Sequence, residues 1–101
     1  MNFFKHDINK KKKIAKRKLR DWGLAYMDDQ AVVVGYSSLV DLIISDDDDS
    51  PEEIIESKAG RVFRKTVRGI IKQVYKDVID ETREMPTENE FRSELPDLIL
   101  N

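Results

Sequence analysis

The sequence predicts a mainly α-helical fold, and three features of the chain support this prediction. Apolar residues recur at helical spacing between Ile8 and Met27. A second such pattern follows a clear helix start at Ser50 and Pro51 and continues to about Glu84. The composition, 40% hydrophobic and 38% charged, is typical of a small helical protein with a large wetted surface.

The length and composition limit the class of protein. A chain of 101 residues is expected to form a single domain, residues 1–101, in which residues 1–7 and 97–101 are candidates for disorder. The absence of cysteine excludes disulfides, thiolate metal sites and a cysteine nucleophile. We expect a cytoplasmic protein that does not cross a membrane, because no stretch approaches the roughly 20 apolar residues that a transmembrane helix needs.

The first helix is predicted over Ile8 to Met27. On a helical wheel, one narrow sector holds the apolar residues Ile8, Ala15, Leu19, Trp22 and Tyr26. Lysines and arginines occupy most of the remaining circumference. Gly23 weakens the last turn by up to about 1 kcal/mol relative to alanine, so the helix could end or bend there.

The segment 31–44 allows two interpretations. The β-branched run from Ala31 to Val34, bounded by Gly35, favours a short strand or hairpin near 31–36. The residues that follow, Leu39 to Ile44, fit a short helix capped by Ser37 or Ser38, or alternatively a second strand. We expect the extended segment followed by the short helix, and in either form this stretch belongs to the core.

A long central helix, about 51–84, is the clearest element of the sequence. Ser50 is the predicted N-cap, Pro51 suits the first helical position, and Glu53 completes a capping box with Ser50. Pro86 stops the pattern, and Gly60 and Gly69 are candidate break points.

A last short helix is predicted from Glu88 to Leu95, between its cap Thr87 and Pro96.

The net charge of −2 conceals four blocks of alternating sign. Residues 1–20 hold nine basic residues against Asp7, and residues 21–57 hold eleven acids and no base. Residues 58–83 are again mainly basic, and residues 84–101 mainly acidic. Segregation of this kind indicates that the electric field of the protein guides its choice of partner.

The central helix carries a stripe of cations opposite its apolar face. Its members follow one another at spacings of three and four: Lys58, Arg61, Lys65, Arg68, Lys72 and Lys76. An ordinary solvated face mixes both signs of charge, whereas this stripe suits a phosphate backbone. The alternative is that Asp46 to Asp49, another acidic segment of this chain, or an acidic segment of a second copy neutralises it.

The N-terminal helix is the stronger candidate for nucleic-acid contact, because runs of like charge commonly form interaction arms. A solubilising or intramolecular role and an anionic membrane surface are the alternatives. The narrow apolar sector, with Ala15 and Tyr26, argues against the membrane. The residues predicted to contact DNA or RNA are Lys10, Lys11, Lys12, Lys13, Lys16, Arg17, Arg20, Arg61, Lys65, Arg68 and Lys72.

Catalysis and cofactor binding are not expected. His6 is the only histidine and has no evident partner to make it a general base. Asp46 to Asp49 resemble the start of an EF-hand loop, but Pro51 falls where glycine is required and Ser57 falls where the bidentate glutamate belongs. We therefore predict no enzyme, no metal site and no cofactor. Trp22 and Tyr26 could stack on bases, but their place in the apolar sector favours core packing.

The order of features in the first sixty residues resembles the N-terminal part of ArpU-type phage regulators. Three pieces match: the basic helix ending in Lys16 to Trp22, the segment from Gly35 to Ser38, and Asp49 to Glu52 at the start of a long helix. The resemblance implies a role in phage late transcription. The family's C-terminal helix-turn-helix is not visible in residues 86–101, so its mode of DNA recognition is not implied.

These observations predict a small, non-enzymatic, nucleic-acid-associated regulator, and the resemblance implies a phage origin. The competing hypothesis is a protein interaction or assembly module that binds no nucleic acid. The long helix has more apolar face than the short elements cover, which predicts a homodimer. The expected dimer seam consists of Phe63, Val67, Ile70, Val74 and Val78.

Overall fold

The computed structural model describes the backbone of residues 3–44 and 49–100, with side chains from residue 9 onward in these ranges. This part of the chain contains helices and no strand, so the predicted mainly α fold is confirmed. In chain order the helices are α1 (Phe3–Val33), α2 (Leu39–Ile43), α3 (Pro51–Ile79) and α4 (Glu88–Ser93). The acidic run at 46–48 lies outside the described residues.

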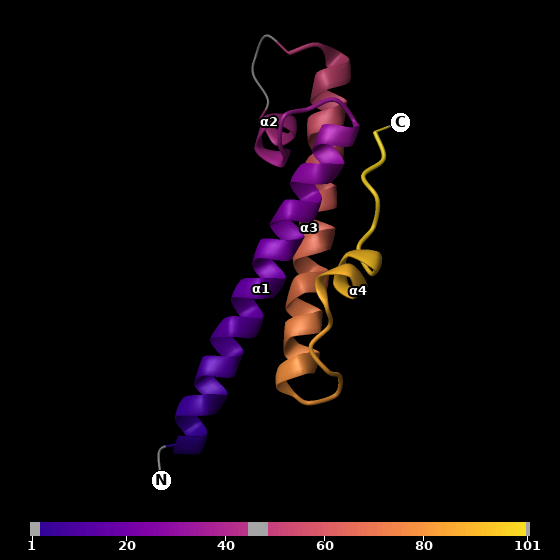
Figure 1. Ribbon diagram of the computed structural model, residues 1–101. Helices are drawn as coiled ribbons and strands as arrows, with labels where there is room; N and C mark the ends of the chain where they lie inside the picture. The colour runs from indigo at the N-terminus through magenta and orange to yellow at the C-terminus, as the bar shows by residue number, and fades with distance from the viewer. Residues whose placement is uncertain (1–2, 45–48, 101) are drawn as a thin grey trace.

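The two long helices, α1 and α3, lie side by side in opposite directions, as Figure 1 shows. The short helix α2 lies beside the end where α1 finishes and α3 begins, and α4 packs nearer the other end (Figure 1). The N-terminal turns of α1 diverge from α3 (Figure 1). The molecule is elongated, with extents of 60 × 24 × 18 Å.

The first helix continues well past its predicted end at Met27 and does not break at Gly23. The missing side chain at Gly23 instead allows α3 to approach, because a Cβ there would lie 2.4 Å from Cδ1 of Ile71. The strand predicted near 31–36 is wrong: α1 includes Ala31, which is fully buried. Burial of this face in the core outweighs the β preference of the three valines that follow.

Gly35 ends α1. It adopts a φ of 101°, and its N–H donates to the carbonyl of Val32 at 3.0 Å. The N–H of Tyr36 donates to the carbonyl of Ala31 at 2.9 Å. These two bonds form a Schellman motif, in which a left-handed residue just after the helix satisfies its last carbonyls.

The predicted starts of the other helices are confirmed. In α2 the hydroxyl of Ser38 accepts from the N–H of Asp41 at 3.1 Å, which excludes the alternative second strand. In α3 Ser50 accepts from the N–H of Glu53 at 3.2 Å, with Pro51 in the first turn. The capping box predicted there forms only in this half, because no bond from the Ser50 N–H to the Glu53 side chain is found between these described residues. Thr87 begins α4 with a capping box.

The long helix α3 is unbroken at its glycines but ends at Ile79, before the predicted residue 84. A second Schellman motif ends it. Glu81 has a φ of 62°, its N–H donates to Val78, and the N–H of Thr82 donates to the carbonyl of Asp77 at 2.9 Å. The prediction used Pro86 as the stop, whereas the backbone already turns at Glu81.

The C-terminal segment returns along α1, where disorder was considered for residues 97–101. The phenol of Tyr26 donates to the carbonyl of Pro96 at 2.9 Å. Leu98 is buried, and its N–H donates to Oε1 of Gln30 at 3.0 Å. Residues 96–98 are therefore part of the packed structure.

The core lies between α1 and α3 and is closed by α2, α4 and the C-terminal segment. Its buried members come from all of these elements: Leu19, Tyr26, Met27, Ala31, Leu39, Leu42, Phe63, Val67, Val74, Phe91, Leu95 and Leu98. The predicted inner faces of the two long helices are largely confirmed. Val62, which the apolar pattern of the central helix also placed on the inner face, is an exception, because 66% of it is exposed.

Candidate functional site

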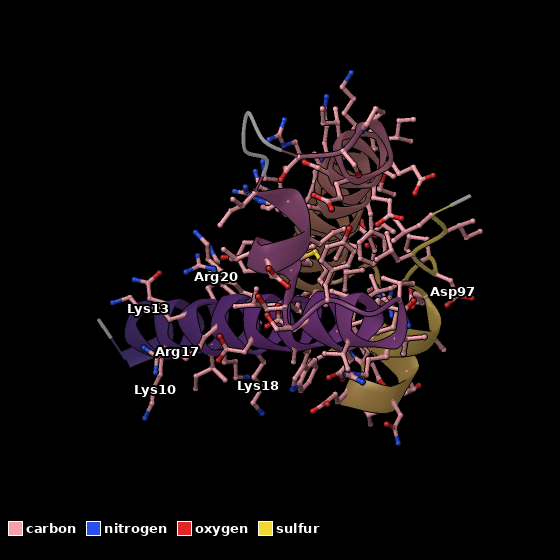
Figure 2. The ribbon with its side chains drawn as sticks, turned by 90° about the horizontal axis from the view of Figure 1, so that it is seen from above. Lys10, Lys13, Arg17, Lys18, Arg20 and Asp97 are labelled. Carbon is pink, nitrogen blue, oxygen red and sulfur yellow. The ribbon has the colours of Figure 1, made fainter. Side chains whose placement is uncertain are left out.

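The cations of α1 surround the helix. All those predicted to contact nucleic acid, Lys10 to Lys13, Lys16, Arg17 and Arg20, are exposed except Lys12, which is half-buried. Figure 2 shows Lys13 and Arg20 on the side of α1 toward α2 and α3, and Lys10 and Lys18 on the opposite side. Asp97 lies at the far end of this view, away from the labelled cations (Figure 2).

The cations of α3 form an exposed row along the helix. Arg61, Lys65, Arg68 and Lys72 are all exposed, as predicted. Arg64, which the predicted stripe omitted, is also exposed. From Arg61 to Lys72 the row extends about 16 Å at 1.5 Å per residue. Together with Gly69, these five cations line one shallow hollow on the surface of α3.

A groove between α1, α2 and α3 brings the two sets of cations together. Its volume is about 370 Å³. The cations at its rim are Lys16 and Arg20 from α1, and Arg64, Arg68 and Lys72 from α3. The remaining lining residues are apolar or aromatic: Leu24, Met27, Leu39, Val40, Ile43, Ile71 and Tyr75. Among the described residues, no acid lines this groove.

The basic surface continues from the groove toward the N-terminus of α1. A neighbouring hollow is lined by Lys13, Lys16, Arg17, Arg20 and Asp21. Asp21 is the single acid in that set. Lys16 and Arg20 belong to both hollows, so the α1 cations and the α3 cations form one continuous surface.

The ion pairs that the described residues form with one another lie away from this groove. Arg83 makes two bonds to Glu94, at 2.8 and 2.9 Å, and Arg92 bonds Asp29 at 2.7 Å. In the described part of the chain, the five cations at the groove rim form no ion pair. This is the arrangement required of a surface that attracts an external anion.

Arg61 differs from the groove cations, because its guanidinium donates to the carbonyl of Ile43 at 3.1 Å. This bond joins the start of the α3 row to the end of α2. The alternative prediction was that the acidic loop, Asp46 to Asp49, neutralises the cation row of α3. Of these four residues, Asp46 to Asp48 lie outside the described part of the chain.

The seam predicted for a homodimer is part of the core of a single chain. Phe63, Val67 and Val74 are buried, and Ile70 and Val78 pack against the same cluster. Their periodicity correctly indicated burial. The partner is α1 with the elements around it, so these five residues do not form an exposed seam.

The two aromatic residues considered for base stacking are core residues. Tyr26 is buried and Trp22 is half-buried, with its ring 6.3 Å from that of Phe91. Arg92 lies over the Tyr26 ring at 5.6 Å. Tyr75 is the aromatic residue that faces the groove.

Within residues 9–44 and 49–100, no group of three or more His, Cys, Asp or Glu side chains could hold a metal ion. The side chain of His6 lies outside the described set. No helix in the described part of the chain is long and apolar enough to cross a membrane.

Sequence reasoning missed Arg64 and the apolar floor of the groove. Arg64, Arg68 and Lys72 are spaced four residues apart, which was a signal for a second row beside the predicted stripe. No sequence pattern indicated the floor of the groove, its apolar lining. Leu24 and Val40 are separated in the chain and line the same groove only because α1 and α2 pack together.

Comparisons with known proteins do not assign the chain to a family. No protein-family model matches it, and neither the curated proteins nor the solved structures gave a significant match.

Proposed function

We propose that the protein is a small nucleic-acid-associated regulator that contacts phosphates through the basic surface formed by α1 and α3. One observation carries this proposal: cations from two distant parts of the chain line one groove that contains no acid among the described residues. The resemblance to ArpU-type phage regulators is consistent with it.

The physical basis is counterion release. Each phosphate neutralised by a lysine or arginine frees condensed cations, so affinity falls steeply with salt. The rows on α1 and α3 present cations over about three helical turns each, which matches a ligand with charges repeated along its length. Like-charged side chains this close repel one another, and an external polyanion removes that repulsion.

Two double variants of equal net charge test the proposal. Arg20→Glu with Arg68→Glu reverses one cation on each side of the groove. Lys10→Glu with Lys18→Glu is the matched control. The sequence placed Lys10 among the nucleic-acid contacts, but both side chains lie on the side of α1 away from the groove (Figure 2), so this proposal assigns them no contact.

Binding to labelled single- and double-stranded oligonucleotides would be measured between 50 and 200 mM salt. We expect the groove variant to lose at least tenfold in affinity. The slope of the log association constant against log salt should become less steep by about 2. The control should lose less than about threefold. Equal losses in both variants would discard the groove as the contact.

The competing function is an assembly module without nucleic-acid binding, and the apolar floor of the groove favours it as the second candidate. It predicts little oligonucleotide binding at any salt, together with oligomerisation that responds to salt. Light scattering coupled to size exclusion, with and without oligonucleotide, separates the two functions.

A further inference from the structure

The groove between α1, α2 and α3 has a floor that a phosphate backbone does not require. Leu24 and Val40 at this floor are 49% and 56% exposed, and Met27 and Leu39 continue it inward. An exposed apolar surface with a charged rim is typical of a binding groove. Its occupant must therefore offer apolar groups as well as negative charge.

The shape of the groove limits the occupant further. Its α1 wall runs from Lys16 to Met27 and its α3 wall from Arg64 to Tyr75. Each wall is about 16 Å long, or three turns of helix. Because the two walls belong to antiparallel helices, a third helix placed between them would complete a small bundle of ordinary geometry.

The distribution of charge along the groove indicates whether its occupant is a helix or a lipid. Lys16 and Arg20 lie one turn apart on one wall, and on the other Arg64, Arg68 and Lys72 extend over about 12 Å. A fatty acid or phospholipid has its charge at one end and would leave most of these cations without a partner. An amphipathic helix with acids on both sides of an apolar ridge meets both rows and the floor together.

We propose that this groove binds an amphipathic helix of a partner protein, with an apolar ridge at i, i+3 and i+4 spacing and Asp or Glu along both flanks. The inference does not depend on nucleic-acid binding. Both ligands would share Arg20 and Arg68, whereas only the helix needs Leu24 and Val40.

A pair of synthetic peptides tests the proposal on the unaltered protein. The first is an 18-residue helix with leucines along one ridge, glutamates on both flanks, and a back face of alanine and glutamine. The second replaces every flanking glutamate with lysine. Fluorescence anisotropy of labelled peptide, without nucleic acid, should give at least tenfold tighter binding for the glutamate peptide. Equal binding of both peptides would overturn the charge argument.

Neutral substitutions then locate the peptide. The double variant Leu24→Asn with Val40→Asn, called the floor variant, should weaken binding of the glutamate peptide at least tenfold. Val62→Asn, on an exposed valine that does not line the groove, should change it less than twofold. An unchanged affinity in the floor variant would overturn the proposal. So would a protein that is dimeric alone and becomes monomeric in the floor variant, because a second copy would then cover the groove.

Discussion

Gly60 of α3 lies directly against Leu42 of α2. A Cβ on Gly60 would be 2.8 Å from both Cγ and Cδ2 of Leu42, and 3.2 Å from Cγ2 of Ile43. Leu42 is only 1% exposed, so it has little freedom to move away. The glycine therefore sets the distance at which α2 packs on α3, and α2 supplies part of the groove.

Alanine at Gly60 should destabilise the fold. We expect a loss of roughly 1–2 kcal/mol in the free energy of unfolding, because overpacking costs more than the helix propensity of alanine returns. Gly69→Ala is the matched control: a Cβ there meets nothing within 4 Å, so it should stabilise the protein by up to about 1 kcal/mol. Urea denaturation of both variants measures the difference, and a change of the same sign in both would contradict this packing role.

The glycines also illustrate what sequence alone could predict. Helix starts were predictable, because a cap such as Ser38, Ser50 or Thr87 acts through bonds to its next few residues. The end of α3 was not, because the helix ends at Ile79 through a left-handed conformation at Glu81, a non-glycine residue that no local sequence pattern indicated. The sequence indicated Gly60 as a possible break in the helix. Its role is instead to let α2 pack closely, and a contact with another helix is not visible in the local sequence.

The candidate site was predictable only in part. The spacing of Arg61, Lys65, Arg68 and Lys72 indicated an exposed row. Their meeting with Lys16 and Arg20 depends on how α1 and α3 are rotated about their axes, which a single sequence does not specify. For the same reason, the apolar pattern around Phe63 indicated burial but not whether the covering helix belonged to the same chain.

The C-terminal segment should contribute to stability through Leu98. This side chain is 7% exposed, and its neighbour Ile99 is 68% exposed. Leu98→Ala should lower the free energy of unfolding by about 2–4 kcal/mol, because it removes buried apolar surface and leaves a cavity. Ile99→Ala should change it by less than about 0.5 kcal/mol. Thermal and urea melts check both variants. Equal small effects would mean that the segment is not docked in solution.

Tyr36 should make the protein sensitive to alkaline pH. Its phenol donates a hydrogen bond to the Glu56 carboxylate, and this bond, with burial and the negative charge of Glu56, raises the pKa of Tyr36 to about 12. The unfolded pKa is about 10. A raised pKa favours the neutral form, so this contribution to stability is fully present below pH 10 and is lost as pH rises to 12.

The variant Tyr36→Phe isolates this contribution from the other groups that titrate in the same range. The difference in the free energy of unfolding between wild type and variant should be constant up to about pH 9 and should shrink between pH 10 and 12. A difference independent of pH would show that the bond to Glu56 does not persist in solution.

The two proposed ligands of the groove make separable demands on it. Reversing Arg20 and Arg68 should weaken both an oligonucleotide and the acidic peptide at least tenfold, because each relies on the same cations. Replacing Leu24 and Val40 with asparagine leaves the charge unchanged, so it should weaken only the peptide. Since the ligands share cations, unlabelled peptide should also displace a bound oligonucleotide from the wild type but not from the floor variant. Simultaneous binding of both ligands at full affinity would mean that the phosphates lie outside the groove, on cations of α3 such as Lys65 that do not line it.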